Sequence, residues 1–131
     1  MSLAREKGDV GERIAREYLE AKGWRLVEAN WSCKAGEIDL IFDDPTAPIG
    51  RPGTAGVVRV FVEVKTRMPT SYGWPQEAVA WQKQRKLLKA AQWYSQEKDY
   101  WGDIRFDVVA ITLLDGHEPE IEHIEYSFES H

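Results

Sequence analysis

The sequence predicts a single α/β domain in which a mixed β-sheet is flanked by helices. Three observations support this prediction. The chain has 131 residues, enough to bury one core but too few for two domains. Two segments place apolar residues at the spacing of an amphipathic helix, and other segments alternate apolar and polar residues as strands do. The predicted order is α-β-β-β-α-β, followed by a possible edge strand.

The first helix is expected from about Arg5 to Lys22, with Gly23 as a natural stop. Five residues at helical spacing predict its buried face: Gly11, Ile14, Ala15, Tyr18 and Leu19. Alternating or apolar segments then predict three strands, near Trp24–Trp31, Gly36–Phe42 and Val57–Thr66.

The segment Asp43–Gly56 separates the second and third predicted strands. It is rich in residues that interrupt a strand: Pro45, Pro48, Pro52, Gly50, Gly53 and Gly56. We therefore expect a long, mobile hairpin loop at 43–56.

A second helix is expected over Pro75–Lys98, because Pro75 suits the first turn of a helix. Six residues form its predicted buried face: Ala80, Trp81, Leu87, Leu88, Ala91 and Tyr94. A strand at Arg105–Leu113 follows, and a final strand is expected near Ile121–Phe128.

Composition restricts the class of protein. The lone cysteine, Cys33, excludes an internal disulfide and a cysteine metal cluster. No apolar run reaches the roughly 18 residues of a membrane span, and the first residues lack the apolar core of a signal peptide. We therefore expect a cytoplasmic protein with no membrane partner.

The net charge of −5 is unevenly distributed along the chain. Residues 115–131 form an acidic C-terminal segment with six acidic residues and no Lys or Arg. The remaining residues carry 17 basic against 16 acidic side chains, and the second predicted helix is locally positive. Because local fields decide where a polyanion docks, the acidic total does not exclude a nucleic-acid partner.

Two predicted strands carry the residues that indicate chemistry. Residues two apart in a strand share a face, so Glu63 projects with Lys65, and Glu37 with Asp39, while Ile38, Leu40 and Phe42 point the other way. If these strands pair as a hairpin, acids and a lysine converge on one surface. Two carboxylates plus a substrate phosphate suit Mg²⁺, and a nearby ammonium stabilises negative charge in the transition state.

The order of residues along the chain also resembles a known family. Asp39 followed by Glu63-Val64-Lys65 is similar to the PD-(D/E)XK signature of restriction-type nucleases. The wider pattern resembles the YraN-type bacterial family, a group similar to Holliday-junction resolvases. It comprises Gly11-Glu12, Ala15, Tyr18-Leu19, Gly23, Asn30-Trp31, Gly36–Ile41, Phe61–Arg67, Gly73, Ala78-Val79, Lys83 and Arg105–Val108.

The resemblance implies a restriction-endonuclease-like fold and a set of roles. Asp39 and Glu63 would hold the metal, Lys65 would be the catalytic lysine, and Glu12 would be an acid brought to the site by the first helix. Two features depart from the family pattern. The 43–56 loop is longer than the short turn expected there, and Ser32 stands where an arginine is expected.

Several further residues have both a functional and a structural interpretation. Glu37 is expected to support Asp39 rather than to bind the metal, and Gln84 is either a polar residue near the site or a hydrogen-bonded core glutamine. The side chains of Lys34, Arg67 and Lys83 are candidate contacts for nucleic acid. Glu63 and Lys65 alternatively form an exposed ion pair worth about 0–1 kcal/mol. The tryptophans Trp24, Trp81 and Trp93 are expected in the core or at helix edges, whereas the histidines His117, His123 and His131 lack metal-site spacing and receive no role.

The leading functional prediction is an endonuclease dependent on Mg²⁺ or Mn²⁺ that hydrolyses DNA, including branched or flapped structures. One alternative is a nucleic-acid-binding or assembly module that keeps the fold with little catalysis. Another is a protein-interaction domain that uses the acidic C-terminal segment. A homodimer is a compatible assembly.

Overall fold

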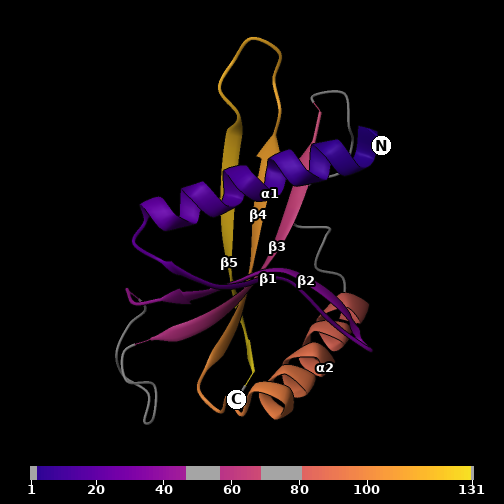
Figure 1. Cartoon of the computed structure of the whole chain (residues 1–131), viewed down its shortest axis with the longest axis vertical. Helices are drawn as coiled ribbons and strands as arrows, with labels where there is room; N and C mark the ends of the chain where they lie inside the picture. The colour runs from indigo at the N-terminus through magenta and orange to yellow at the C-terminus, as the bar shows by residue number, and fades with distance from the viewer. Residues whose placement is uncertain (1–2, 47–56, 69–80, 131) are drawn as a thin grey trace.

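The computed structural model of the protein describes residues 3–46, 57–68 and 81–130. They form a five-stranded sheet in the order β1-β2-β3-β4-β5 with two helices, which confirms the predicted α-β-β-β-α-β order and the final strand (Figure 1). The elements are α1 (Leu3–Ala21), β1 (Arg25–Cys33), β2 (Gly36–Asp44), β3 (Val58–Arg67), α2 (Trp81–Lys98), β4 (Ile104–Thr112) and β5 (Glu120–Ser130).

Helix α1 ends where the sequence predicts. Gly23 has a left-handed backbone (φ 91°), a conformation that costs glycine little. The amides of Lys22 and Trp24 both donate to the carbonyl of Leu19, so the last turn is closed before β1 begins. The predicted apolar face of α1 is also confirmed, since Gly11, Ala15 and Leu19 are buried.

The sheet is mixed. Strands β1, β2 and β3 pair antiparallel, β3 and β4 pair parallel, and β4 and β5 pair antiparallel. A parallel pair needs a crossover connection, and α2 lies within the one that joins β3 to β4. Every residue of β4 is buried, as expected for a strand covered on both faces.

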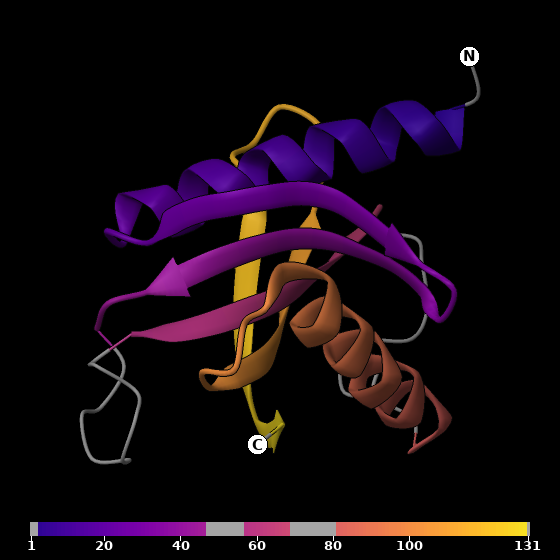
Figure 2. The ribbon, with the colours of Figure 1, turned by 60° about the horizontal axis from the view of Figure 1, so that its bottom comes forward.

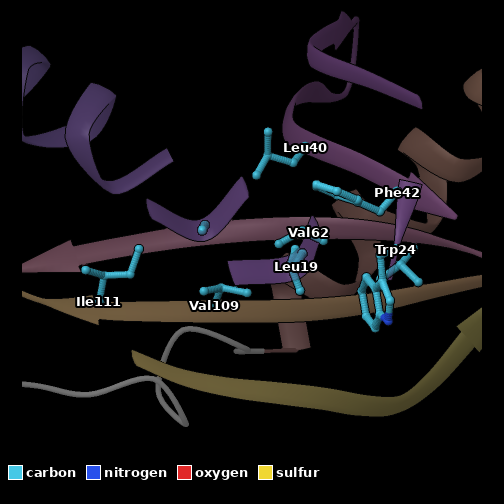
Figure 3. Close-up of a cluster of buried hydrophobic side chains, with 9 residues drawn as sticks. Leu19, Trp24, Leu40, Phe42, Val62, Val109 and Ile111 are labelled. Atoms are coloured by element: carbon cyan, nitrogen blue, oxygen red, sulfur yellow. The ribbon is translucent and has the colours of Figure 1, made fainter. Parts of the chain in front are cut away.

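The two helices cover opposite faces of the sheet (Figure 2). On the α1 side, Ala15 and Leu19 pack with Val60 and Val62 of β3 in one buried cluster (Figure 3). On the α2 side, Phe61 packs with Ala91 and Tyr94 in a second cluster. Residues of β3 therefore alternate between two cores, and Glu63 and Lys65 continue the row that begins with Phe61.

Two predictions about β2 are wrong. The strand continues through Asp43 and Asp44, which the sequence predicts in the 43–56 loop, and both carboxylates have arginine partners across the sheet. Arg59 donates twice to Asp43 (2.9 and 3.0 Å), and Arg105 donates to Asp44 (3.2 Å).

The second wrong prediction about β2 concerns Ile38. It packs in the α2-side cluster rather than with Leu40 and Phe42, which lie in the α1-side cluster. Ile38 pairs with Trp31 of β1, which belongs to the same cluster, and the preceding residue, Asn30, has a left-handed backbone (φ 53°). Figure 2 shows that both strands are strongly curved.

Helix α2 is described from Trp81, so Pro75–Ala80 of the predicted helix lie outside the described residues, as do residues 47–56 of the predicted loop. Its predicted buried residues Ala91 and Tyr94 are confirmed, and Ala90 joins them. Neither of the described helices combines the length and the hydrophobicity that a membrane crossing requires.

Candidate metal-binding and catalytic site

Asp39 lies where the β2–β3 pairing ends. The last paired residues are Leu40 and Val62, so the same register continued by one residue sets Asp39 opposite Glu63. The Asp39 Oδ2 atom accepts a hydrogen bond from the backbone N–H of Val64 (2.9 Å). This bond ties the carboxylate to the adjacent strand and fixes its orientation. A free surface aspartate would have no such constraint. The predicted placement of Asp39 and Glu63 on adjacent strands is confirmed.

Glu63 and Lys65 share a face of β3, as strand alternation predicts. The Lys65 Nζ atom lies 3.2 Å from Glu63 Oε1, and the two side chains are 43% and 20% exposed. The ammonium is therefore next to a predicted metal ligand, although a pair this exposed adds little to stability. The Lys65 ammonium is therefore close enough to interact electrostatically with the carboxylate of Glu63.

Glu12 reaches the same region from α1. With the Asn30 amide turned so that its Nδ2 atom faces the carboxylates, Asn30 donates to Glu12 Oε1 (3.1 Å) and to Glu37 Oε1 (3.2 Å). Asn30 thus joins a helix-borne acid to an acid of β2. Glu37 is held by this amide, and its expected role in support of Asp39 stays a prediction.

The pKa of Glu12 is influenced by the acids around it. Burial raises the pKa of Glu12 above its ordinary value, and the negative charges of Asp39, Asp9 and Glu37 raise it further. The hydrogen bond from Asn30 opposes these effects. A cation bound among these carboxylates would relieve their repulsion, so the donor set suits a hard divalent metal ion.

The close approach of α1 to β3 is what brings Glu12 to the sheet. Gly11 is buried directly against Thr66, and a Cβ atom at position 11 would overlap Thr66 Oγ1 and crowd Thr66 Cβ and Cγ2 at 3.1 and 3.3 Å. Only glycine permits this contact without displacement of one element. Glu12 is the next residue on the helix, so its position depends on that contact.

The acids are near one another but not tightly gathered. Among the side chains that the structure describes, no three of Glu12, Glu37, Asp39 and Glu63 have ligand atoms within 4.8 Å of one another. The site therefore consists of a fixed Asp39, a Glu63–Lys65 pair and a Glu12–Asn30–Glu37 link around it.

The predicted nucleic-acid contacts have different surroundings. Lys34 is exposed in the turn between β1 and β2, with its Nζ atom 5.6 Å from the centroid of the Trp93 ring. Arg67 ends β3 and its Nε atom donates to Thr112 Oγ1 (3.4 Å), so it is partly engaged within the sheet. Lys83 and Gln84 belong to α2, but their side chains lie outside the described part of the chain.

A second group of charged residues, missed by the sequence analysis, lies between β4 and β5. Arg105 donates to both oxygens of buried Asp107 (2.8 and 2.9 Å), and His123 Nε2 lies 2.8 Å from Asp107 Oδ2. The side chain of His123 is only 4% exposed, and its Nδ1 atom is 2.9 Å from Lys22 Nζ. His123, which received no role from its spacing, therefore joins β5 to the end of α1.

Asp107, His123 and Glu125 could hold a metal ion, because their ligand atoms lie within 4.8 Å of one another. However, the guanidinium of Arg105 already donates to both oxygens of Asp107. The same arrangement is therefore also consistent with an internal ion network that holds no metal. The signal for it is present in the sequence: Arg105 and Asp107 are charged residues two apart in an otherwise apolar strand, and buried charges need partners.

Comparison with known proteins shows similarity over most of the chain. The sequence model of the group described as Uncharacterised protein family UPF0102 matches residues 11–111. A UPF0102 protein of Alkaliphilus metalliredigens is 42% identical over 127 residues, which cover 96% of this chain and 100% of that protein. UPF0102 proteins of Rhodococcus opacus (40%; 92% and 94% covered) and Geotalea daltonii (45%; 93% and 88% covered) are similarly close.

Proposed function

This chain belongs to the uncharacterised protein family UPF0102, and from the geometry of its site we propose that it is a metal-dependent endonuclease. Its substrate would be DNA, including branched or flapped structures, and its reaction the hydrolysis of a phosphodiester bond. One observation carries the proposal. The oriented carboxylate of Asp39 lies where the β2–β3 pairing ends, with the Glu63–Lys65 pair on the adjacent strand and with Glu12 of α1 close enough to interact with Asp39 electrostatically.

Asp39 and Glu63 are the residues that would hold Mg²⁺ or Mn²⁺. When bound there, such an ion supplies Lewis-acid stabilisation of a scissile phosphate and lowers the pKa of a bound water. Asp39 is suited to this role because the Val64 N–H fixes its orientation before any ligand arrives. Preorganisation of this kind avoids a reorganisation cost during the reaction.

Lys65 is proposed to stabilise the negative charge that develops on the phosphate. Its ammonium is held beside Glu63, so it is already directed towards the site. Glu12, held by Asn30, is proposed to accept a hydrogen bond from the attacking water. Its ionised form is costly among neighbouring acids, and a cation or a bound water would reduce that cost.

The proposal is tested by cleavage of a panel of linear, flapped and four-way-junction DNA with Mg²⁺, with Mn²⁺ and with EDTA. Wild type should cut at least one substrate only when metal is present. Glu63→Gln removes a ligand charge while keeping the shape, so cleavage should be lost. Lys65→Ala should reduce the rate by about 10²–10³-fold, the usual cost of losing one preorganised transition-state donor.

A matched control is Glu20→Gln, because Glu20 is an exposed acid near the end of α1 that forms a surface ion pair with Arg16. This variant should cut as wild type does. Cleavage that persists in Glu63→Gln would place the reaction elsewhere and reject the proposal.

A binding module without catalysis is the second candidate. Two observations favour it: the Lys65 ammonium is engaged by Glu63, and the site acids are not gathered to the spacing of a metal centre. It predicts DNA binding by wild type with no metal-dependent cleavage of any substrate in the panel.

A further inference from the structure

One stripe of α2 combines basic side chains with an exposed aromatic ring. The side chains of Lys86, Lys89 and Trp93 are exposed. Lys86 lies seven residues and Lys89 four residues before Trp93, a spacing that places the three on one face of a helix. Trp93 is 43% exposed, although the adjacent face of α2 buries Ala90 and Tyr94. The stripe therefore presents a partly exposed aromatic ring beside two exposed lysines.

The tertiary structure adds a fourth residue to this stripe. Lys34, in the turn between β1 and β2, lies over the Trp93 ring with its Nζ atom 5.6 Å from the centroid. We define the Trp93 stripe as Lys34, Lys86, Lys89 and Trp93. It therefore joins two elements that are far apart in sequence.

The position of the stripe relative to β1 is held by buried and polar contacts. Trp31 Nε1 donates to Glu97 Oε2 (2.7 Å), one helical turn after Trp93, and Lys98 Nζ lies 3.5 Å from Glu28 Oε1. The Trp31 ring also packs edge-on against Tyr94, with centroids 5.3 Å apart. These contacts keep α2 and the β1–β2 hairpin together, so the lysine and the ring are presented as a unit.

We propose that the Trp93 stripe binds an unpaired nucleic-acid strand, with one base stacked on the exposed part of the Trp93 ring that Lys34 does not cover and with Lys34, Lys86 and Lys89 paired with its phosphates. Stacking on an aromatic ring combined with a basic track is the physical basis of single-strand binding, because every base has a π-face and every nucleotide a phosphate. A paired duplex hides its base faces, so it offers this ring nothing to stack on.

The inference rests on the proposed endonuclease function and names its substrate as one with an unpaired segment. Lys34 precedes Asp39 by five residues on the same hairpin, which corresponds to about 16 Å of extended chain. A strand anchored on Trp93 would therefore lie within a few nucleotides of the candidate site. The stripe would select for the single-stranded arm of a flap or a branch.

The experiment measures fluorescence anisotropy of labelled oligo(dT), oligo(U) and a blunt duplex of equal length, all in EDTA. Wild type should bind one or both single strands more tightly than the duplex, and the two single strands distinguish DNA from RNA. Trp93→Ala should weaken single-strand binding by about 5- to 150-fold, the range that corresponds to one stacked base. Trp93→Phe should restore most of the affinity.

The lysines are tested by the salt dependence of the same binding. In Lys86→Gln/Lys89→Gln, the slope of log affinity against log salt should become shallower by about 1.4, because two phosphate contacts are lost. Trp93→Ala should keep the wild-type slope, since stacking releases no counterions. A change in affinity at constant slope therefore reports the contribution of the Trp93 ring, and a change in slope reports that of the lysine charges.

Trp101→Ala is the matched control, because Trp101 is 73% exposed and its Nε1 atom donates to Asp99 rather than facing the stripe. It should bind as wild type does, and circular dichroism should show each variant folded. The inference is overturned if Trp93→Ala binds single strands like wild type, or if the duplex is preferred. Because binding is measured in EDTA, it does not depend on cleavage. Trp93-dependent binding here, together with no metal-dependent cleavage of any substrate in the DNA panel, would reject the endonuclease and leave the stripe standing.

Discussion

At the scale of single residues, Asn30 is the link that organises the candidate site. Its left-handed backbone (φ 53°) is a conformation that asparagine adopts more readily than most residues. The amide of Asn30 reaches Glu12 and Glu37 at once. A single residue therefore links an acid of α1 to an acid of β2.

The charge on Glu12 should destabilise the metal-free protein. Burial and the neighbouring acids raise the pKa of Glu12, so the folded state favours its protonated form. As the pH rises above the ordinary pKa of 4.5, the unfolded chain loses this proton more easily, and the free energy of unfolding falls. Glu12→Gln keeps the Oε1 atom that accepts from Asn30 but removes the charge. We expect a melting temperature about 1–3 °C higher at neutral pH in EDTA, a few tenths of a kcal/mol.

Two comparisons check this prediction for Glu12. The gain in melting temperature should disappear below pH 4.5, where the acid is protonated in the folded and unfolded chains alike. Added Mg²⁺ should stabilise wild type more than Glu12→Gln. A variant that melts below wild type at neutral pH would show that the carboxylate is stabilising instead.

At the scale of elements, the contact of α1 with β3 positions the helix-borne acid. Gly11 and Thr66 meet with no room for a Cβ atom, so the helix lies closer to the sheet than packed side chains would allow. Helix α2 has the corresponding role on the other face, where its contacts with β1 present the Trp93 stripe. Each helix thus carries one functional element to the β1–β2 hairpin.

Gly11→Ala should separate α1 from β3. The gain in helix propensity, about 1 kcal/mol, opposes an overpacking cost of about 1–3 kcal/mol. We expect a net loss of roughly 1 kcal/mol in urea unfolding and a large loss of cleavage, because Glu12 moves with the helix.

The double variant Gly11→Ala/Thr66→Ala tests the origin of that loss. Thr66→Ala removes the Oγ1 and Cγ2 atoms that a Cβ at position 11 would meet and leaves only the Thr66 Cβ contact at 3.1 Å, so the double variant should be more stable than the sum of the single effects predicts. Additive effects would mean that the contact does not limit the approach of the helix.

At the scale of the whole molecule, a buried ion network joins four elements. Arg105 of β4 is bonded to Asp107 and to Asp44 of β2, Asp107 is bonded to His123 of β5, and His123 contacts Lys22 at the end of α1. Arg105 also lies over the Trp24 ring, 5.3 Å from its centroid. A network of this kind gives little net stability while intact, but the loss of one member leaves uncompensated buried charge.

Arg105→Leu should therefore destabilise the fold by about 3–5 kcal/mol, because Asp44 and Asp107 would remain buried without a cation. Equilibrium urea unfolding measures this loss. The matched control is Arg16→Gln, which breaks an exposed ion pair with Glu20 and should change stability by at most about 1 kcal/mol. An Arg105→Leu protein as stable as the control would show that the network is dispensable.

The sequence by itself determined the order of the elements, the apolar face of α1, and the shared face of Glu63 and Lys65. These are local properties, because helical and strand periodicity bring residues within a few positions of each other onto one face. The charges of Arg105 and Asp107 also stand out in the sequence as exceptions within an apolar strand, although their pairing was found only in the structure.

Only the tertiary structure decided which distant residues meet. The Asn30 link between Glu12 and Glu37, the packing of Ile38 on the α2 side, the partners of His123, and the lysine over Trp93 all depend on contacts between separate elements. Periodicity specifies the face on which a side chain lies but not the strand register, helix placement or local backbone irregularity that brings two faces together. In this chain, the left-handed residue at position 30 carries the link between Glu12 and Glu37, and the missing Cβ at position 11 lets α1 approach β3.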